Sequence, residues 1–190
     1  SHKSYIDFLV LSYVFYQRGL IPPHIAAGIN MAFWPAGPLF RRCGAFFLRR
    51  TFKGDPIYGA VFKQYLVKLL EEGFMIEFFP EGTRSRTGKL SKPKYGMVRM
   101  ILDAFISGRV EKLVFQPISI GYEKIIEGSS YSREAKGGEK KEESAASLLK
   151  ASSVLVSNYG RVYIEFAEPI RLTDYLARYG IPRDEPSEEQ

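Results

Sequence analysis

Short apolar runs of strand length alternate along this chain with segments of helical period, and this alternation is the strongest constraint on its fold. Strands are predicted at residues 24–29, 45–48, 74–79, 113–120 and 162–166. Helices are predicted at residues 7–18, 37–43, 57–72, 95–107, 145–158 and 173–179. The pattern predicts the α/β class, with a mixed central sheet flanked by helices.

The segment 57–72 is the clearest amphipathic helix. Its apolar side chains fall on one face and Gly73 follows its end, so we expect this face to be buried. The predicted buried residues are Val61, Tyr65, Leu66, Leu69 and Leu70.

One domain is predicted over residues 1–183, followed by a disordered tail at 184–190. Residues 128–144 are rich in Ser, Gly, Lys and Glu, which is typical of a solvated insertion. An α/β domain rarely opens on a loop that feeds a buried helix. We therefore expect the domain to be truncated on its N-terminal side.

Positive charge is concentrated in two stretches that contain no acidic residue. The first lies between Asp7 and Asp55, and the second between Glu81 and Asp103, in a chain of net charge +6. Such stretches indicate an anionic partner, whether phosphate, nucleic acid or an acidic membrane surface, although solvated faces are the simpler interpretation. The basic residues concerned are Arg18, Arg41, Arg42, Arg49, Arg50 and Lys53, then Arg84, Arg86, Lys89, Lys92, Lys94 and Arg99.

Several functional classes are disfavoured by composition and spacing. The single cysteine, Cys43, excludes an internal disulfide, and with only two histidines a structural metal is not expected. Five residues rather than four separate Gly82 from Gly88, and Leu90 replaces the Ser or Thr of a nucleotide-binding P-loop. The longest apolar run, residues 6–16, is shorter than the ~20 residues of a membrane-spanning helix.

Two predicted strands end in arginine-rich segments. Residues 45–48 lead into Arg49 and Arg50, and residues 74–79 lead into a loop that carries Arg84 and Arg86. Open α/β sheets bind ligands at the carboxyl ends of their strands, and the planar guanidinium group suits bidentate contacts with phosphate. Gly82 permits a positive φ or a close approach of the backbone to a ligand.

His2 and Asp7 form a third candidate site. Two helical positions five residues apart do not share a face, so these side chains meet only if a turn precedes the helix. Asp7 then fixes one imidazole nitrogen and leaves the other as a general base. The simpler alternative, which spacing alone favours, is an N-terminal Asp7 that caps the helix beside a loose His2.

Four segments resemble the motifs of the glycerolipid acyltransferases, in the family's order. His2 to Asp7 is similar to the His-x4-Asp motif, and residues 44–50 resemble the second motif. Phe79-Pro80-Glu81-Gly82-Thr83-Arg84-Ser85-Arg86 resembles the third, and Phe115-Gln116-Pro117-Ile118-Ser119-Ile120 the fourth. Residues 22–38 look especially like the bacterial membrane-bound glycerol-3-phosphate 1-O-acyltransferases.

The resemblance implies a catalytic domain that transfers a fatty acyl group from an acyl thioester to the sn-1 hydroxyl of glycerol 3-phosphate. It implies no cofactor beyond the co-substrate, acyl-CoA or acyl-acyl carrier protein, and no metal. His2 is then the general base and Asp7 orients it. The implied substrate-binding residues are Arg50, Lys53, Glu81, Gly82, Arg84, Ser85, Arg86 and Pro117.

The same resemblance predicts peripheral contact with membrane lipid at the cytoplasmic face of a membrane, the inner membrane in a bacterium. A nucleic-acid partner is not expected, because most aromatic residues fall at core positions. Two alternatives remain: a dihydroxyacetone-phosphate acyltransferase, and a non-catalytic module that binds acidic membranes.

Overall fold

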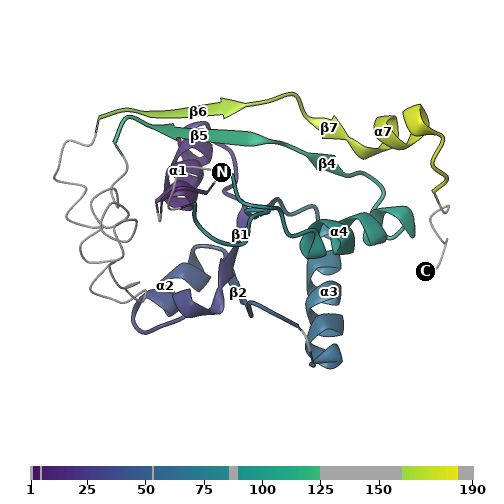
Figure 1. Cartoon of the computed structure of the whole chain (residues 1–190), viewed down its shortest axis with the longest axis horizontal. Coiled ribbons are helices and arrows are strands. Elements are labelled where there is room, and N and C mark those ends of the chain that lie inside the picture. Colours follow the sequence, from purple (N-terminus) through teal and green to yellow (C-terminus); the bar gives the residue numbers. More distant parts are fainter. Residues whose placement is uncertain (1, 5, 53, 86–89, 125–159, 184–190) are drawn as a thin grey trace. The chain divides into compact units, whose positions relative to one another are not determined.

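The computed structural model describes residues 2–4, 6–52, 54–85, 90–124 and 160–183 (Figure 1). The described helices are α1 (Asp7–Gln17), α2 (Ala36–Arg42), α3 (Pro56–Glu71), α4 (Gly96–Ile106), α7 (Leu172–Tyr179) and a 3-10 turn at Ile29–Met31. The described strands are β1 (His24–Gly28), β2 (Ala45–Leu48), β3 (Ile76–Glu77), β4 (Val114–Phe115), β5 (Ile118–Tyr122), β6 (Val162–Phe166) and β7 (Ile170–Arg171). The predictions for 128–144, 145–158 and 184–190 lie outside the described residues.

The described strands form three small sheets. One has the order β2-β1-β3, and in it β1 and β2 are parallel, with Ile25 opposite Ala45 and Gly28 opposite Leu48. The others are the antiparallel pair β4-β7 and the pair β5-β6. This mixture of helices and strands confirms the α/β class.

The chain divides into two compact units. The first comprises Ser1–Arg50, Glu77–Pro93 and Ile120–Tyr163, and the second comprises Thr51–Ile76, Lys94–Ser119 and Ile164–Gln190. Because three separate stretches of chain build each unit, residues far apart in sequence become neighbours within it.

The first unit contains α1, α2, β1 and β2. Leu11 of α1, Ile25 of β1 and Phe46 of β2 are buried. Phe8 of α1 packs edge to face against Phe40 of α2, with 6.0 Å between ring centroids. These apolar contacts hold the start of α1, and with it the segment that carries the candidate base.

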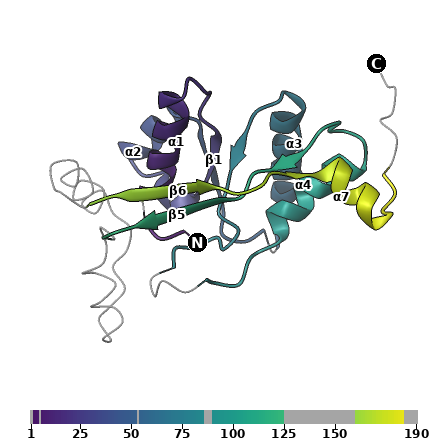
Figure 2. The same ribbon diagram turned by 90° about the horizontal axis from the view of Figure 1, so that it is seen from above.

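In the second unit α3 packs against α4 (Figure 2). Asp55 caps α3 by accepting a hydrogen bond from the Tyr58 amide at 2.9 Å. The predicted buried face of α3 is partly wrong, because Val61 and Tyr65 are exposed. The buried face is turned towards α4, where Val67 packs with Ala104 and Val110; its buried residues are Phe62, Leu66, Val67 and Leu69.

Two predicted strands are shorter than their apolar runs. The Phe74 amide donates to the Leu69 carbonyl at 2.9 Å and thereby closes α3, so β3 begins only at Ile76. The run 113–120 is divided between β4 and β5 at Gln116 and Pro117, since proline has no N–H to donate to a sheet.

Candidate active site

A tight turn returns His2 to the first residue of α1. The Asp7 amide donates to the Ser4 carbonyl at 3.3 Å, and the Ser4 hydroxyl accepts from the Ile6 amide at 3.4 Å. The turn places His2 Nδ1 2.7 Å from Asp7 Oδ2. Asp7 is only 1% exposed, so this hydrogen bond is largely shielded from water.

The Asp7 carboxylate accepts hydrogen bonds on both oxygens. Oδ2 also accepts from the Lys3 amide at 2.8 Å and the Ser4 amide at 3.2 Å, and Oδ1 accepts from the Tyr122 hydroxyl. Burial alone would raise the pKa of Asp7, but the hydrogen bonds from His2, Tyr122 and Lys3, with the charge of His2, lower it overall. Asp7 is therefore held as a carboxylate that faces the imidazole.

The second imidazole nitrogen of His2 remains available. The ring stacks on Phe79 with 4.1 Å between centroids and 24° between planes, and the His2 side chain is 16% exposed. Within the described segments no hydrogen bond engages Nε2. With Nδ1–H donated to Asp7, Nε2 carries the lone pair and can accept a proton.

The loop after β3 lies against the His2 segment, which unites two candidate sites that are remote in sequence. The Ser85 amide donates to the His2 carbonyl at 2.7 Å. Gly82 has φ 62°, the left-handed conformation that its position was expected to need. Glu81 is buried and accepts from the Ser91 amide at 3.1 Å, and Ser85 is buried as well.

The predicted cationic residues are only partly described. Arg50 follows the carboxyl end of β2 in the unit that holds His2, and it is exposed. No hydrogen bond or ion pair joins Arg50 to another described residue. Arg84 is half-buried in the loop after Gly82, whereas Lys53 and Arg86 lie outside the described residues.

Pro117 belongs to the second unit, where it is exposed between β4 and β5. Its carbonyl accepts from the Ala167 amide at 3.0 Å. This contact joins the residue before β5 to the residue after β6. A role for Pro117 in substrate binding stays a prediction.

Three residues of the site were not anticipated from the sequence. Tyr122 lies 115 residues from Asp7, and no local pattern signals their contact. Phe79 was predicted as the last residue of a strand, but its stacking on the His2 ring was not predicted. The sequence does mark Glu77, which is the single acidic side chain within the apolar run 74–79.

Glu77 is buried in β3 and 9% exposed. Its two carboxyl oxygens have no hydrogen-bond partner among the described residues. Burial, and to a smaller degree the charge of Asp7, raise the pKa of Glu77 to about 8. The pKa values of Asp7 and Glu77, which belong to the same unit, are therefore shifted in opposite directions.

The side chains that the structure describes contain no group of three or more His, Cys, Asp or Glu residues placed to hold a metal ion. What they do contain is a histidine oriented by a buried carboxylate, a glycine-containing loop beside it and an exposed arginine in the same unit. Such an arrangement can remove a proton from a hydroxyl group on an anionic molecule.

Comparison with known families gives two matches, one after the other along the chain. The family model described as Acyltransferase matches residues 1–121. The model described as Glycerol-3-phosphate acyltransferase C-terminal region matches residues 131–190. The first match contains the predicted site residues from His2 to Pro117, and Tyr122 lies one residue beyond its end.

Proposed function

The chain belongs to the acyltransferase family, in its glycerol-3-phosphate acyltransferase type, and we propose that His2 and Asp7 are its catalytic pair. The protein is an O-acyltransferase that transfers an acyl group to glycerol 3-phosphate in phospholipid biosynthesis. The observation that carries the catalytic proposal is the 2.7 Å contact of His2 Nδ1 with Asp7, which leaves Nε2 without a partner among the described residues.

In the proposed reaction, Nε2 of His2 removes the proton from the sn-1 hydroxyl of glycerol 3-phosphate. The oxygen attacks the thioester carbonyl carbon of acyl-CoA or acyl-acyl carrier protein, and a C–O bond forms. The tetrahedral intermediate then expels the thiolate as the C–S bond breaks, and the imidazolium returns the proton to sulfur. Asp7 stabilises the imidazolium, so no covalent acyl-enzyme and no cofactor are needed.

We assign the acceptor phosphate to the cationic residues of the second and third motif segments. Arg50 is exposed at the edge of the sheet where β1 and β2 end, as a phosphate ligand requires. Gly82 lets the loop backbone come close to the acceptor, and Glu81 and Ser85, both buried, fix the shape of that loop. From their motif positions, Arg86 and Lys53 are assigned to the same phosphate, and Arg84 to the acceptor pocket around it.

Replacement of Arg50 by Ala tests this assignment in the enzyme. We expect the KM for glycerol 3-phosphate to rise about 10–100-fold with a smaller change in kcat, because one charge-assisted contact with phosphate contributes roughly 1.5–3 kcal/mol. Arg50→Lys should recover part of the loss, since it restores charge but not bidentate geometry. The measurement is thiol release from acyl-CoA at varied acceptor concentration.

Arg18→Ala is the matched control, because Arg18 is exposed after α1 and lies outside the motif segments. Glycerol without phosphate should be used equally poorly by the wild type and the Arg50 variant. An Arg50→Ala enzyme with an unchanged KM for glycerol 3-phosphate would exclude Arg50 from the phosphate site.

We further propose that the surface around α2 contacts anionic lipid. No helix in the described part of the chain has the length and apolar character to cross a bilayer. Trp34 is 82% exposed and Leu39 60%, and Arg41 and Arg42 are exposed at the end of the same helix. Exposed apolar side chains next to basic ones are typical of peripheral binding to an acidic membrane face.

A double variant, Trp34→Ala with Leu39→Ala, is expected to bind vesicles of anionic phospholipid about tenfold more weakly, because both side chains lose apolar area that would enter the lipid. Vesicle co-sedimentation measures the effect. Ile57→Ala, at an equally exposed apolar position on α3, is the control. Equal binding by both variants and the wild type would place the lipid contact elsewhere.

A further inference from the structure

Glu77 is a buried titratable group that the proposed reaction does not use. It lies in β3, next to β1 in the sheet, and neither of its carboxyl oxygens has a hydrogen-bond partner among the described residues. An ionised carboxylate buried in this way is costly without a hydrogen-bonding or cationic partner, and the described residues supply none. Buried polar groups without partners are rare in proteins, so this one calls for a physical explanation.

Asp7 is the charged group that acts on Glu77. Asp7 has the hydrogen-bond donors that Glu77 lacks: two backbone amides, the Tyr122 hydroxyl and the His2 ring donate to its carboxylate. These donors stabilise the ionised form of Asp7. Glu77 has no donor among the described residues, so its ionisation beside a charged Asp7 has a high free-energy cost. The described segments of this unit also contain the charged or titratable residues His2, Lys3, His24, Arg49, Arg50, Glu81, Arg84 and Tyr122, among others.

We propose that Asp7 and Glu77 form an unequal carboxyl pair in which Asp7 carries the negative charge and Glu77 keeps its proton. Glu77 is then a positioning residue that acts on His2 through Asp7. The inference rests on the proposed function, since it concerns the same His2–Asp7 pair. It adds a requirement: the active form of the enzyme has a neutral Glu77.

Loss of the Glu77 proton introduces a second negative charge beside Asp7. That charge opposes the binding of an anionic acceptor and the negative charge that develops on oxygen during attack on the thioester. The active enzyme therefore loses activity as the pH rises through the range in which Glu77 titrates.

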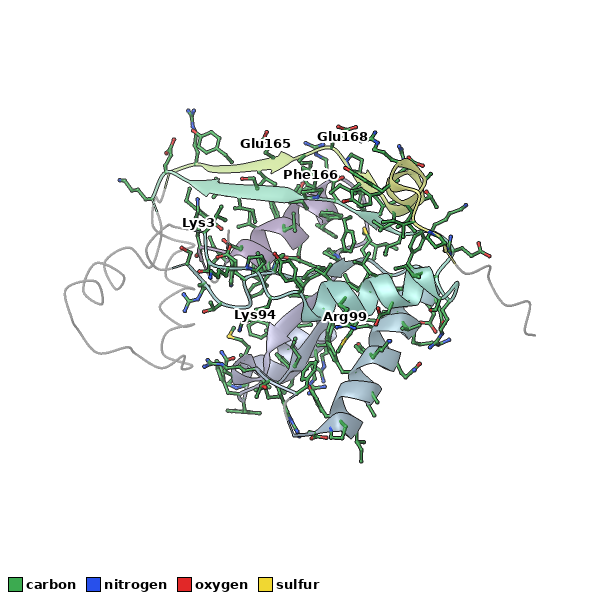
Figure 3. All side chains as sticks on the ribbon, turned by 45° about the vertical axis from the view of Figure 1, so that its right-hand side comes forward. Lys3, Lys94, Arg99, Glu165, Phe166 and Glu168 are labelled. Carbon is green, nitrogen blue, oxygen red and sulfur yellow. The ribbon has the colours of Figure 1, made fainter. Side chains whose placement is uncertain are left out.

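The pH dependence of kcat/KM for glycerol 3-phosphate provides the kinetic test. We expect wild-type kcat/KM to fall about tenfold between pH 7 and pH 9.5, and the fall to be absent in Glu77→Gln, which cannot ionise. At pH 7 the variant should lie within about threefold of the wild type. Glu168→Gln, at an exposed position after β6 (Figure 3), should keep the wild-type profile.

Infrared spectroscopy tests the protonation state without relying on activity. With ¹³C-labelled glutamate, the wild type should show the C=O band of a protonated carboxyl at pH 6.5 and lose it by pH 9.5. Glu77→Gln, or Glu77→Met if the first variant does not fold, should lack the band. Absence of the band in the wild type at pH 6.5 overturns the inference, whatever the kinetics.

The two tests separate this inference from the proposed function. A band that titrates, with an alkaline fall in kcat/KM that persists in Glu77→Gln, overturns the link between Glu77 and His2 but leaves His2 as the base. A His2 variant of full activity would overturn the proposed function, while the infrared result would still decide the protonation of Glu77.

Discussion

Replacement of Asp7 by Asn is expected to lower kcat about 10³–10⁴-fold with little change in the fold. Asn has nearly the same shape, but two of the groups around Asp7 are fixed donors, the amides of Lys3 and Ser4, whereas the Tyr122 hydroxyl on the other oxygen can donate or accept. An Asn amide nitrogen turned towards His2 would force Nδ1 to accept, and the proton would move to Nε2. The base would then be lost.

The opposite orientation of Asn is no better for catalysis. An amide oxygen facing Nδ1 keeps the tautomer, but it is neutral and stabilises the imidazolium far less than a carboxylate does. Steady-state kinetics of Asp7→Asn and of the control Asp174→Asn, an exposed site in the first turn of α7, measure the effect. A kcat for Asp7→Asn within tenfold of the wild type would contradict the orienting role.

Replacement of Glu77 by Gln is expected to stabilise the protein at neutral and alkaline pH. The pKa of Glu77 rises from an ordinary value of 4.5 to about 8 on folding, chiefly because of burial. Between these values the folded state holds a proton that the unfolded state has released, so the free energy of unfolding falls as the pH rises. The stabilising effect is complete below pH 4.5 and lost above pH 8.

At ~1.36 kcal/mol per pKa unit, the free energy of unfolding falls by about 5 kcal/mol over the whole range. About 3 kcal/mol of this fall has occurred by pH 7. Gln does not ionise, so the stability of the Glu77→Gln variant relative to the wild type should increase with pH over this range. Denaturant unfolding at pH 5 and pH 7.5 measures the difference, with Glu168→Gln as the control. A difference that does not depend on pH would show that Glu77 is ionised in the folded protein.

Local chemistry made several features of the site predictable. Asp7 begins a helix as its charge and position indicated, Gly82 has the positive φ that a glycine in that loop suggested, and Arg50 follows a strand end. These features depend on a few neighbouring residues. Spacing alone favoured a loose histidine, because the His2–Asp7 contact requires the turn at Ser4.

Features that depend on remote contacts were not predictable. Tyr122 reaches Asp7 only because the end of β5 belongs to the same unit as α1. The buried face of α3 follows from its packing on α4, which the helical period of α3 alone does not specify. The significance of Glu77 arises from burial without a hydrogen-bond partner among the described residues, which the apolar run 74–79 does not specify.

The central claim is that Nε2 of His2 takes the proton from the acceptor hydroxyl, and it is tested most directly in a chain with only two histidines. Thiol release from acyl-CoA with glycerol 3-phosphate should be measured for His2→Ala and His24→Ala, with vesicle binding as a check on folding. We predict a loss of at least about 10³-fold for His2→Ala and less than about fivefold for His24→Ala, whose Nδ1 lies 3.2 Å from the Gly44 carbonyl. Undiminished turnover by His2→Ala would contradict the mechanism.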